Sequence, residues 1–258
     1  MRAVPAIVFW AALVLPARAQ EITIAAAADL RPALEEIASH FQALSAAHIK
    51  TIYGSSGNFY QQIQNGAPFD LFFSANTDYP KKLESAGLTV PGTYYEYARG
   101  KIVLLVSANS KLDLKRGLNV LLDPTVQKIA IADPSHAPYG QAAVAALKAE
   151  NIYDQVSPKF VTGENISQTV SFVLSGAAAA GIVALSLALT PSTSSQVRFA
   201  EIPAHDYSPI QQACVVLRSS KNQSYATQFQ SYVRSRDAAT IFERYGFEVP
   251  ADKAKPVQ

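Results

Sequence analysis

The sequence predicts an α/β protein of two lobes, each a mostly parallel sheet flanked by helices, with a ligand cleft between the lobes. Short apolar runs alternate with amphipathic helical patterns, and both halves of the chain show this alternation. The 258 residues provide enough chain for two units of about 100 residues each. With 49% hydrophobic and 16% charged residues, the composition is that of a folded protein and excludes a disordered one.

The first half contains three apolar runs, each followed by a helical pattern. Pro32 suits the first turn of the first helix, and Gly87 is expected to stop the third. The order strand, helix, strand implies parallel strands covered by helices. The predicted strands are 21–28, 49–53 and 70–73, and the predicted helices are 32–44, a stretch through Phe59 and Ile63 to Gly66, and 78–86.

The second half repeats the same alternation. Its apolar runs predict strands, and the stretches between them have apolar residues at helical spacing. A polar stretch at 191–196 is expected to be a loop within this half. The predicted strands are 101–107, 128–132, 160–161, 179–184 and 213–218, and the predicted helices lie within 113–122, 141–150, 166–175 and 225–245.

The chain is expected to cross between the lobes twice. The crossings are predicted near Arg99-Gly100 and near Asp206-Tyr207, so that the C-terminal segment returns to the first lobe. The first lobe then consists of residues 20–100 together with 207–258, and the second lobe consists of residues 101–206.

The first nineteen residues have the features of a secretory signal peptide. Arg2 is a positively charged start, residues 6–15 are apolar but too few to span a bilayer, and Ala17-Arg18-Ala19 predicts cleavage after Ala19. Without Arg2 and Arg18, 20 basic residues balance 20 acidic ones. A neutral protein lacks the positive charge that attracts nucleic acid, so we expect a periplasmic protein that binds none.

No catalytic or metal-binding motif stands out. His40 and His48 form no ligand pattern with a cysteine or carboxylate, and the zinc-protease, nucleophile-elbow and P-loop motifs are absent. Cys214 lies in an apolar run and is expected to be a buried small hydrophobe rather than a nucleophile. His136, in the turn after a predicted strand, is a minor candidate for lining the cleft.

Four strand-to-helix junctions carry short side chains that suit an anion site. Ligands of open α/β sheets bind outside the carboxyl ends of strands, where the N–H groups of helix starts lack intrahelical partners and favour an anion. Each junction alone is weak evidence, because Asp29, Ser55, Ser56 and Asn165 are most simply N-caps. The junctions are 28–30 and 54–57 in the first lobe and 137–140 and 163–166 in the second.

The chain resembles the periplasmic molybdate-binding proteins of ABC importers, which have a type II solute-binding fold. GAPFDLFFSAN and ADPSHAPYG carry most of the resemblance, and IAAAADLRPALEEIASHF, GIVALSLAL and IFERYGF extend it over nearly the whole chain after the signal peptide. It implies a monomer that holds a molybdate or tungstate oxyanion through hydroxyl and main-chain N–H donors and delivers it to a membrane permease. It implies no enzymatic activity, no cofactor and no direct metal ligand. The ligand-binding positions that it implies are Ala28, Asp29, Ser56, Tyr139 and Ile166.

Two positions depart from the pattern of this family. Asp29 stands where a small hydroxyl residue or Asn is common, and Ala184 replaces a tyrosine. Like charges about 4 Å apart repel by roughly 4 kcal/mol at an effective dielectric constant of about 20, so Asp29 must point away, be protonated or indicate another ligand. We favour an N-cap role that leaves only its N–H toward the cleft. The hydroxyl of Tyr139 is a hypothetical replacement for the missing tyrosine.

Two other interpretations stay open. Because of Asp29 and Ala184, the same fold is compatible with another anion, such as sulfate or a small organic anion. A periplasmic enzyme or a sensor module is less favoured, since the sequence shows neither an acid–base pair nor a DNA-binding or membrane-spanning segment.

Overall fold

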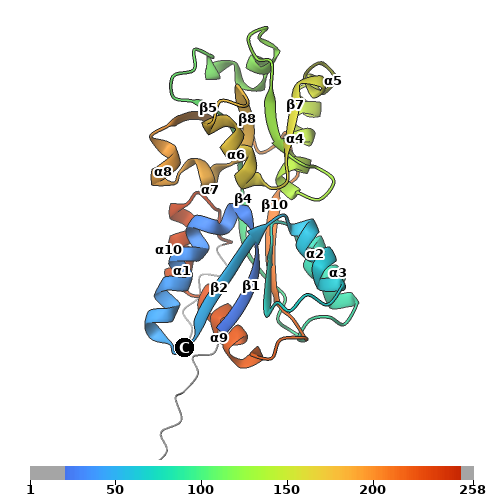
Figure 1. Cartoon of the computed structure of the whole chain (residues 1–258), viewed down its shortest axis with the longest axis vertical. Helices are drawn as coiled ribbons and strands as arrows, with labels where there is room; N and C mark the ends of the chain where they lie inside the picture. Colours follow the sequence, from blue (N-terminus) through green and yellow to red (C-terminus); the bar gives the residue numbers. More distant parts are fainter. Residues whose placement is uncertain (1–20, 251–258) are drawn as a thin grey trace, which may run out of the picture.

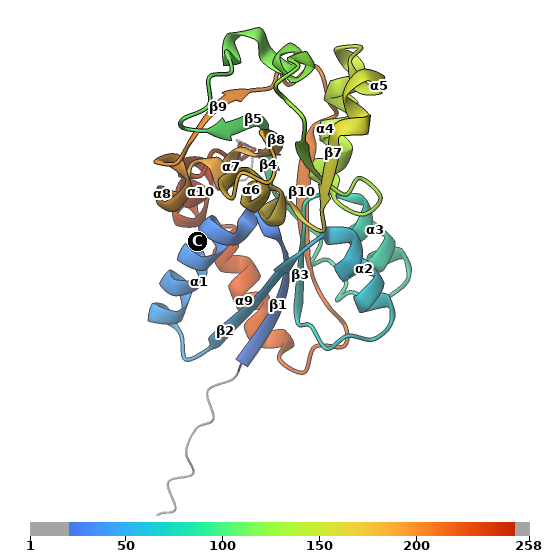
Figure 2. The ribbon, with the colours of Figure 1, turned by 45° about the horizontal axis from the view of Figure 1, so that its top comes forward.

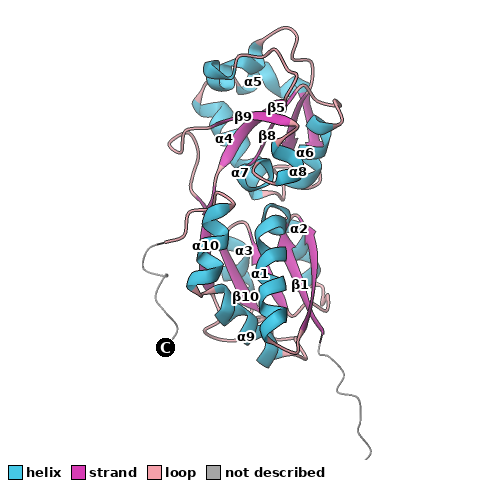
Figure 3. Ribbon diagram, turned by 90° about the vertical axis from the view of Figure 1, so that its left-hand side faces the viewer, coloured by secondary structure: helices cyan, strands magenta, loops and turns pink. Residues whose placement is uncertain are grey.

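The protein forms two lobes that lie one above the other (Figure 1). A computed structural model describes residues 21–250. Each lobe contains a five-stranded sheet with helices packed against it (Figure 3). No helix in this range is both long and apolar enough to cross a membrane. The predicted signal peptide, residues 1–19 with cleavage after Ala19, lies outside the described residues and stays a prediction.

The sheet of the first lobe has the strand order β2-β1-β3-β10-β4. Its strands are β1 (Glu21–Ala27), β2 (His48–Gly54), β3 (Leu71–Ser74), β4 (Tyr95–Gly100) and β10 (Ile210–Val216). Its helices are η1 (Ala28–Leu30), α1 (Arg31–Leu44), α2 (Ser56–Gln64), α3 (Asp78–Ser85), α9 (Gln223–Val233) and α10 (Arg236–Arg244).

The sheet of the second lobe has the strand order β7-β6-β8-β5-β9. Its strands are β5 (Ile102–Ser107), β6 (Ile129–Ala132), β7 (Phe160–Gly163), β8 (Ala180–Ala184) and β9 (Val197–Glu201). Its helices are η2 (Leu114–Leu122), α4 (Pro138–Ala149), α5 (Tyr153–Val156), η3 (Ser157–Lys159), α6 (Ile166–Leu174), α7 (Leu185–Ala188) and α8 (Pro191–Ser194).

One strand in each sheet runs against the others. β10 is antiparallel to both β3 and β4, and β5 is antiparallel to both β8 and β9, whereas the remaining pairs are parallel. The mostly parallel sheets predicted from the sequence are therefore confirmed. The reversed strands follow the two crossings between the sheets, which lie between β4 and β5 and between β9 and β10. The predicted lobe boundaries, 20–100 with 207–258 and 101–206, stay a prediction.

Alternate residues of β3 pack against different helices. Phe72 belongs to the cluster under α2 and α3, whereas Phe73 lies against Tyr97 and Phe229 on the opposite face, with ring centroids 5.4 and 6.2 Å away. Phe229 also meets Phe41 edge to face at 5.2 Å, which fixes α1 and α9 on the same side of the sheet. Cys214 is buried in β10, as predicted.

Several elements differ from the sequence prediction. β4 and β9 were not predicted; both are edge strands whose polar residues break the apolar pattern. The predicted loop at 191–196 contains the short helix α8, and α4 begins at Pro138 rather than at residue 141. The segment η2 is a pair of 3-10 turns, because Gly117 has a φ of 58° and interrupts the helix.

Candidate functional site

One small cavity lies where the two lobes meet. It has a volume of about 10 Å³, roughly the room of one water molecule. The residues around it follow β1, β2 and β3 in the first lobe and begin α4 and α6 in the second (Figure 2). They are Ala27, Ala28, Asp29, Gly54, Ser55, Ser56, Ala75, Ala137, Pro138, Tyr139, Asn165 and Ile166.

All five residues predicted to bind ligand line this cavity, and none is more than 4% exposed. The structure thus brings together residues that lie up to 138 positions apart in the chain, from residue 28 to residue 166. Their role in binding stays a prediction. The five are Ala28, Asp29, Ser56, Tyr139 and Ile166.

Asp29 does not cap a helix, so the N-cap role favoured from the sequence is wrong. The residue lies inside η1, whose N-cap position is Ala27 and has no side-chain capping bond. The Asp29 Oδ2 atom instead accepts hydrogen bonds from Tyr139 Oη at 2.9 Å and from Gln212 Nε2 at 2.7 Å. Its Oδ1 atom is buried and has no hydrogen-bond partner. These contacts aim the carboxyl group into the lobe interface.

Burial controls the protonation of this carboxyl group. Removal from water raises the pKa of Asp29 to about 6, although the hydrogen bonds from Gln212 and Tyr139 and, more weakly, its own backbone N–H lower it. Burial also raises the pKa of the Tyr139 and Tyr97 hydroxyls well above their usual range, and both are further raised by Asp29. The two tyrosines therefore stay neutral donors beside it.

The two serines at the start of α2 have different partners, and neither caps the helix. Ser56 Oγ accepts a hydrogen bond from the backbone N–H of Ala75 at 2.9 Å, within the first lobe. Ser55 Oγ donates to the carbonyl oxygen of His136 at 2.7 Å, in the second lobe. The Ser56 hydroxyl proton is consequently directed away from Ala75, whereas Ser55 joins the lobes.

The second lobe contributes the starts of α4 and α6. Asn165 is an N-cap, as the sequence suggested, because its side chain accepts hydrogen bonds from the backbone N–H groups of Ser167 and Gln168. Ile166 is the first residue of α6, and Tyr139 is the second residue of α4. Backbone N–H groups at these positions have no intrahelical partner and are available to an anion.

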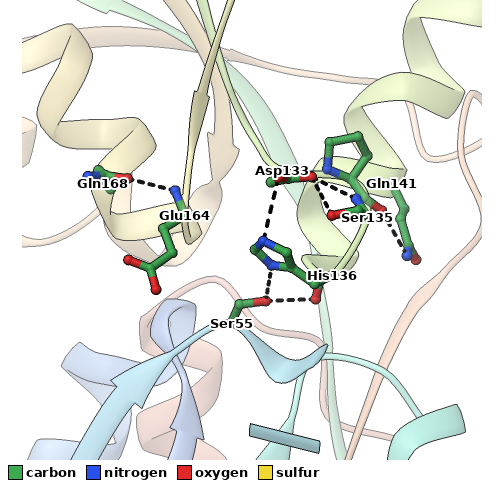
Figure 4. A network of polar contacts seen from close by, with 8 residues as sticks. Ser55, Asp133, Ser135, His136, Gln141, Glu164 and Gln168 are labelled. Carbon is green, nitrogen blue, oxygen red and sulfur yellow. Dashed lines mark hydrogen bonds and ion pairs between the residues drawn. The ribbon is translucent and has the colours of Figure 1, made fainter. Parts of the chain in front are cut away.

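His136 connects the lobes through Ser55, which makes it more than a lining residue (Figure 4). Its carbonyl oxygen accepts from Ser55 Oγ and from the backbone N–H of Gly57 at 3.0 Å. Its ring Nδ1 lies 2.8 Å from Ser55 Oγ, and its Nε2 lies 3.5 Å from Asp133 Oδ2. The tautomer of His136 decides which atom donates in the contact between Nδ1 and Ser55 Oγ.

Sequence reasoning missed Gln212 and Ser186. Gln212 Nε2 contacts both Asp29 and the Tyr139 hydroxyl, the latter at 3.0 Å, and Ser186 Oγ donates to the Asp29 carbonyl at 2.8 Å. Ser186 lies inside an apolar stretch, and Gln212 directly precedes one, the run that begins at Ala213. A polar residue inside or beside such a run was the available signal, because burying it requires a partner.

Ala184, the second departure, ends β8 as expected and is buried. It is absent from the residues around the cavity. The Tyr139 hydroxyl is bonded to Asp29 and Gln212 and is therefore engaged within the protein. Within residues 21–250, no group of three or more His, Cys, Asp or Glu side chains is placed to hold a metal ion.

The chain matches the family of bacterial extracellular solute-binding proteins over residues 22–248. It belongs to this family. It is similar to the molybdate-binding protein ModA of Rhodobacter capsulatus, with 35% identity over 235 residues and 91% of each chain covered. It is also 34% identical to ModA of Azotobacter vinelandii, with 91% of this chain and 92% of that protein covered.

The fold comparison agrees with the family. The solved structure of the Azotobacter vinelandii periplasmic molybdate-binding protein matches with a TM-score of 0.83 and 32% identity. The match covers 89% of this chain and 99% of that one. The fold predicted from the sequence, two lobes of the type II solute-binding kind, is therefore confirmed.

Replacing Ser56 by alanine is expected to destabilise the protein more than the same change at Ser55. Ser56→Ala leaves the buried N–H of Ala75 without its acceptor, which costs about 1–3 kcal/mol. After Ser55→Ala, the His136 carbonyl keeps the Gly57 N–H as a donor. Chemical denaturation of both variants checks the order, and an equal or larger loss for Ser55→Ala contradicts it.

Proposed function

We propose that the chain is an extracytoplasmic solute-binding protein that captures molybdate or tungstate and delivers it to the membrane permease of an ABC importer. The observation that carries the proposal is that all five predicted ligand-binding residues, from both lobes, line one small cavity. Because this cavity has room for about one water molecule, an oxyanion requires the lobes to be further apart than in this structure. Two relatives that align with 91% of this chain are molybdate-binding proteins by name, which supports molybdate as the ligand. The protein acts as a periplasmic monomer without enzymatic activity. It needs no metal cofactor, because the metal is part of the oxyanion that it binds.

The hydrogen-bond donors around the cavity are uncharged, so they would bind an anion without neutralising its charge. Ser56 accepts from Ala75 N–H, which leaves its hydroxyl proton for an oxyanion oxygen. The backbone N–H groups of Tyr139 and Ile166 come from the second lobe. Donors from both lobes converge on one anion, so binding favours the closed form, and hinge closure is the conformational step.

Neutral donors also provide selectivity. Each donor requires an acceptor lone pair, so a fully deprotonated oxyanion satisfies them all, whereas a protonated phosphate brings a hydrogen that finds no acceptor among them. Sulfate has the right charge but is smaller, and fixed donors reach it poorly. Tungstate nearly matches molybdate in size and charge, so the site is expected to bind both.

Another anion on the same fold is the second candidate, and Asp29 is the observation that favours it. An ionised Asp29 would oppose a dianion, sulfate as much as molybdate, and would oppose a singly charged organic anion less, since no cation among the described residues around the cavity offsets it. A sulfate or a small organic anion is the alternative ligand that the sequence left open.

The contact series Ser55, His136 and Asp133 has the residue types of a hydrolase triad, but its hydrogen bonds do not suit catalysis. Ser55 Oγ donates to the His136 carbonyl at 2.7 Å, so its proton is directed to the backbone rather than to a base. Ser55 is also buried, at 5% exposure, in the interface. We assign this series to holding the lobes together.

Thermal unfolding of the chain from residue 20 onward tests the ligand. Molybdate or tungstate at about a thousand times its dissociation constant is expected to add roughly 4 kcal/mol, which raises the Tm by about 10 °C. Sulfate and phosphate at the same concentration serve as controls and are expected to give little change. A shift with sulfate alone supports sulfate as the ligand. The absence of any shift rejects molybdate, tungstate and sulfate and leaves a small organic anion as the second candidate.

Gly57→Ala tests whether binding requires closure. A Cβ at position 57 would lie 2.7 Å from the His136 carbonyl oxygen and 2.9 Å from its Cα, both in the other lobe. We therefore expect the variant to be less stable than the wild type in this arrangement of the lobes, and to lose most of its stabilisation by molybdate. Thermal unfolding with and without molybdate measures both effects.

Asn58→Ala, the next residue of α2, is the matched control for this variant. It is expected to keep the full Tm shift with molybdate. Full stabilisation of Gly57→Ala by molybdate would show that the anion binds without the contact between Gly57 and His136.

A further inference from the structure

The carboxyl group of Asp29 uses only one of its two oxygen atoms. Oδ2 accepts from two donors, whereas Oδ1 is buried without a partner in a residue that is 0% exposed and lines the cavity. Asp70, another buried carboxyl group of the same lobe, differs in this respect. Its Oδ2 accepts from the backbone N–H of Thr23 at 2.7 Å, and its Oδ1 accepts from Ser220 Oγ at 2.6 Å. A buried unsatisfied oxygen is costly, and more so when it carries charge.

No positive charge faces Asp29 among the described residues. Tyr97 from β4 and Tyr139 from α4 are the titratable groups beside it, and both stay neutral. The other elements around it supply only uncharged groups. These come from Gln212 of β10, Ser186 of α7, Ser55 and Ser56 at the start of α2, and Asn165 and Ile166 at the start of α6.

The nearest cation in sequence is engaged elsewhere. The guanidinium of Arg31 lies 4.2 Å from the centre of the Tyr53 ring and 3.3 Å from Glu35. His136 is the nearest histidine in the interface, and its ring contacts Ser55 and Asp133 rather than Asp29. An ionised Asp29 facing a bound dianion would therefore have no compensating charge.

We propose that Asp29 binds the oxyanion as a neutral carboxylic acid. Its Oδ2 atom accepts hydrogen bonds from the protein, and its Oδ1–H group donates to the ligand. Asp29 therefore takes up one proton for each oxyanion that binds. This inference rests on the proposed function. Two donors already occupy Oδ2, so the proton belongs on Oδ1, the oxygen without a partner. A neutral acid then offers one acceptor and one donor, the same pattern as the amide of an asparagine.

The proton balance is simple. In the open form the carboxylate is ionised. It takes one proton from solvent when the dianion binds and the lobes close, and the only covalent bond formed is Oδ1–H. Because closure buries the carboxyl group, which raises its pKa to about 6 even without an anion, and a bound dianion raises it further, the complex favours the protonated form. Lower pH therefore strengthens binding, and higher pH weakens it.

Calorimetric titration with molybdate between pH 6 and pH 8 tests the inference. For the wild type we expect the dissociation constant to rise about tenfold per pH unit, and titrations in buffers of different ionisation enthalpy to show uptake of about one proton. Asp29→Asn is expected to lose most of this pH dependence and to bind more tightly than the wild type at pH 8. Asp70→Asn is the matched control and is expected to keep the wild-type slope.

The outcomes separate this inference from the proposed function. Molybdate binding by the wild type with no proton uptake overturns the role of Asp29 and leaves the proposed function standing. A full slope in Asp29→Asn also overturns it, because the proton is then taken up by another group. A folded wild type that binds neither molybdate nor tungstate at any pH removes both proposals. If Asp29→Asn does not fold, the proton count of the wild type alone decides.

Discussion

The enclosure of the Asp29 carboxyl group between the lobes is the constraint on which the rest of the site depends. One oxygen of this group joins Tyr139 of the second lobe to Gln212 of the first, and the backbone carbonyl of Asp29 accepts from Ser186 across the same interface. This close approach leaves no space for a side chain at Gly100, where a Cβ would lie 2.0 Å from Tyr139 Oη. The contacts that join the lobes at Asp29 are therefore the same contacts that bury its carboxyl group.

The fold provides this enclosure through strand direction. In both sheets the parallel strands end at the interface, and the helices that follow begin there with N–H groups that have no intrahelical partner. Ser56 is oriented by Ala75 N–H and Asn165 caps α6, so short side chains organise these helix starts. The result is a set of uncharged hydrogen-bond donors from both lobes around one cavity.

The sequence predicted the positions of the site better than its chemistry. The cavity residues follow strand ends, and strand ends can be read from apolar runs and from the resemblance to a family. The role of Asp29 was wrong because its partners, Tyr139 and Gln212, are 110 and 183 residues away, and only tertiary packing brings them together. The strands β4 and β9 were missed for a related reason, since edge strands tolerate polar residues that hide the pattern.

The protonation state of Asp29 in the complex tests this account most directly. Carbon-13 NMR of protein labelled at the aspartate carboxyl carbons reports it, and comparison with Asp29→Asn assigns the resonance. At pH 7 with saturating molybdate, we expect the Asp29 carboxyl carbon to have the chemical shift of a neutral acid, unlike the carbon of an ionised aspartate. A carboxylate shift for Asp29 in the molybdate complex would contradict it.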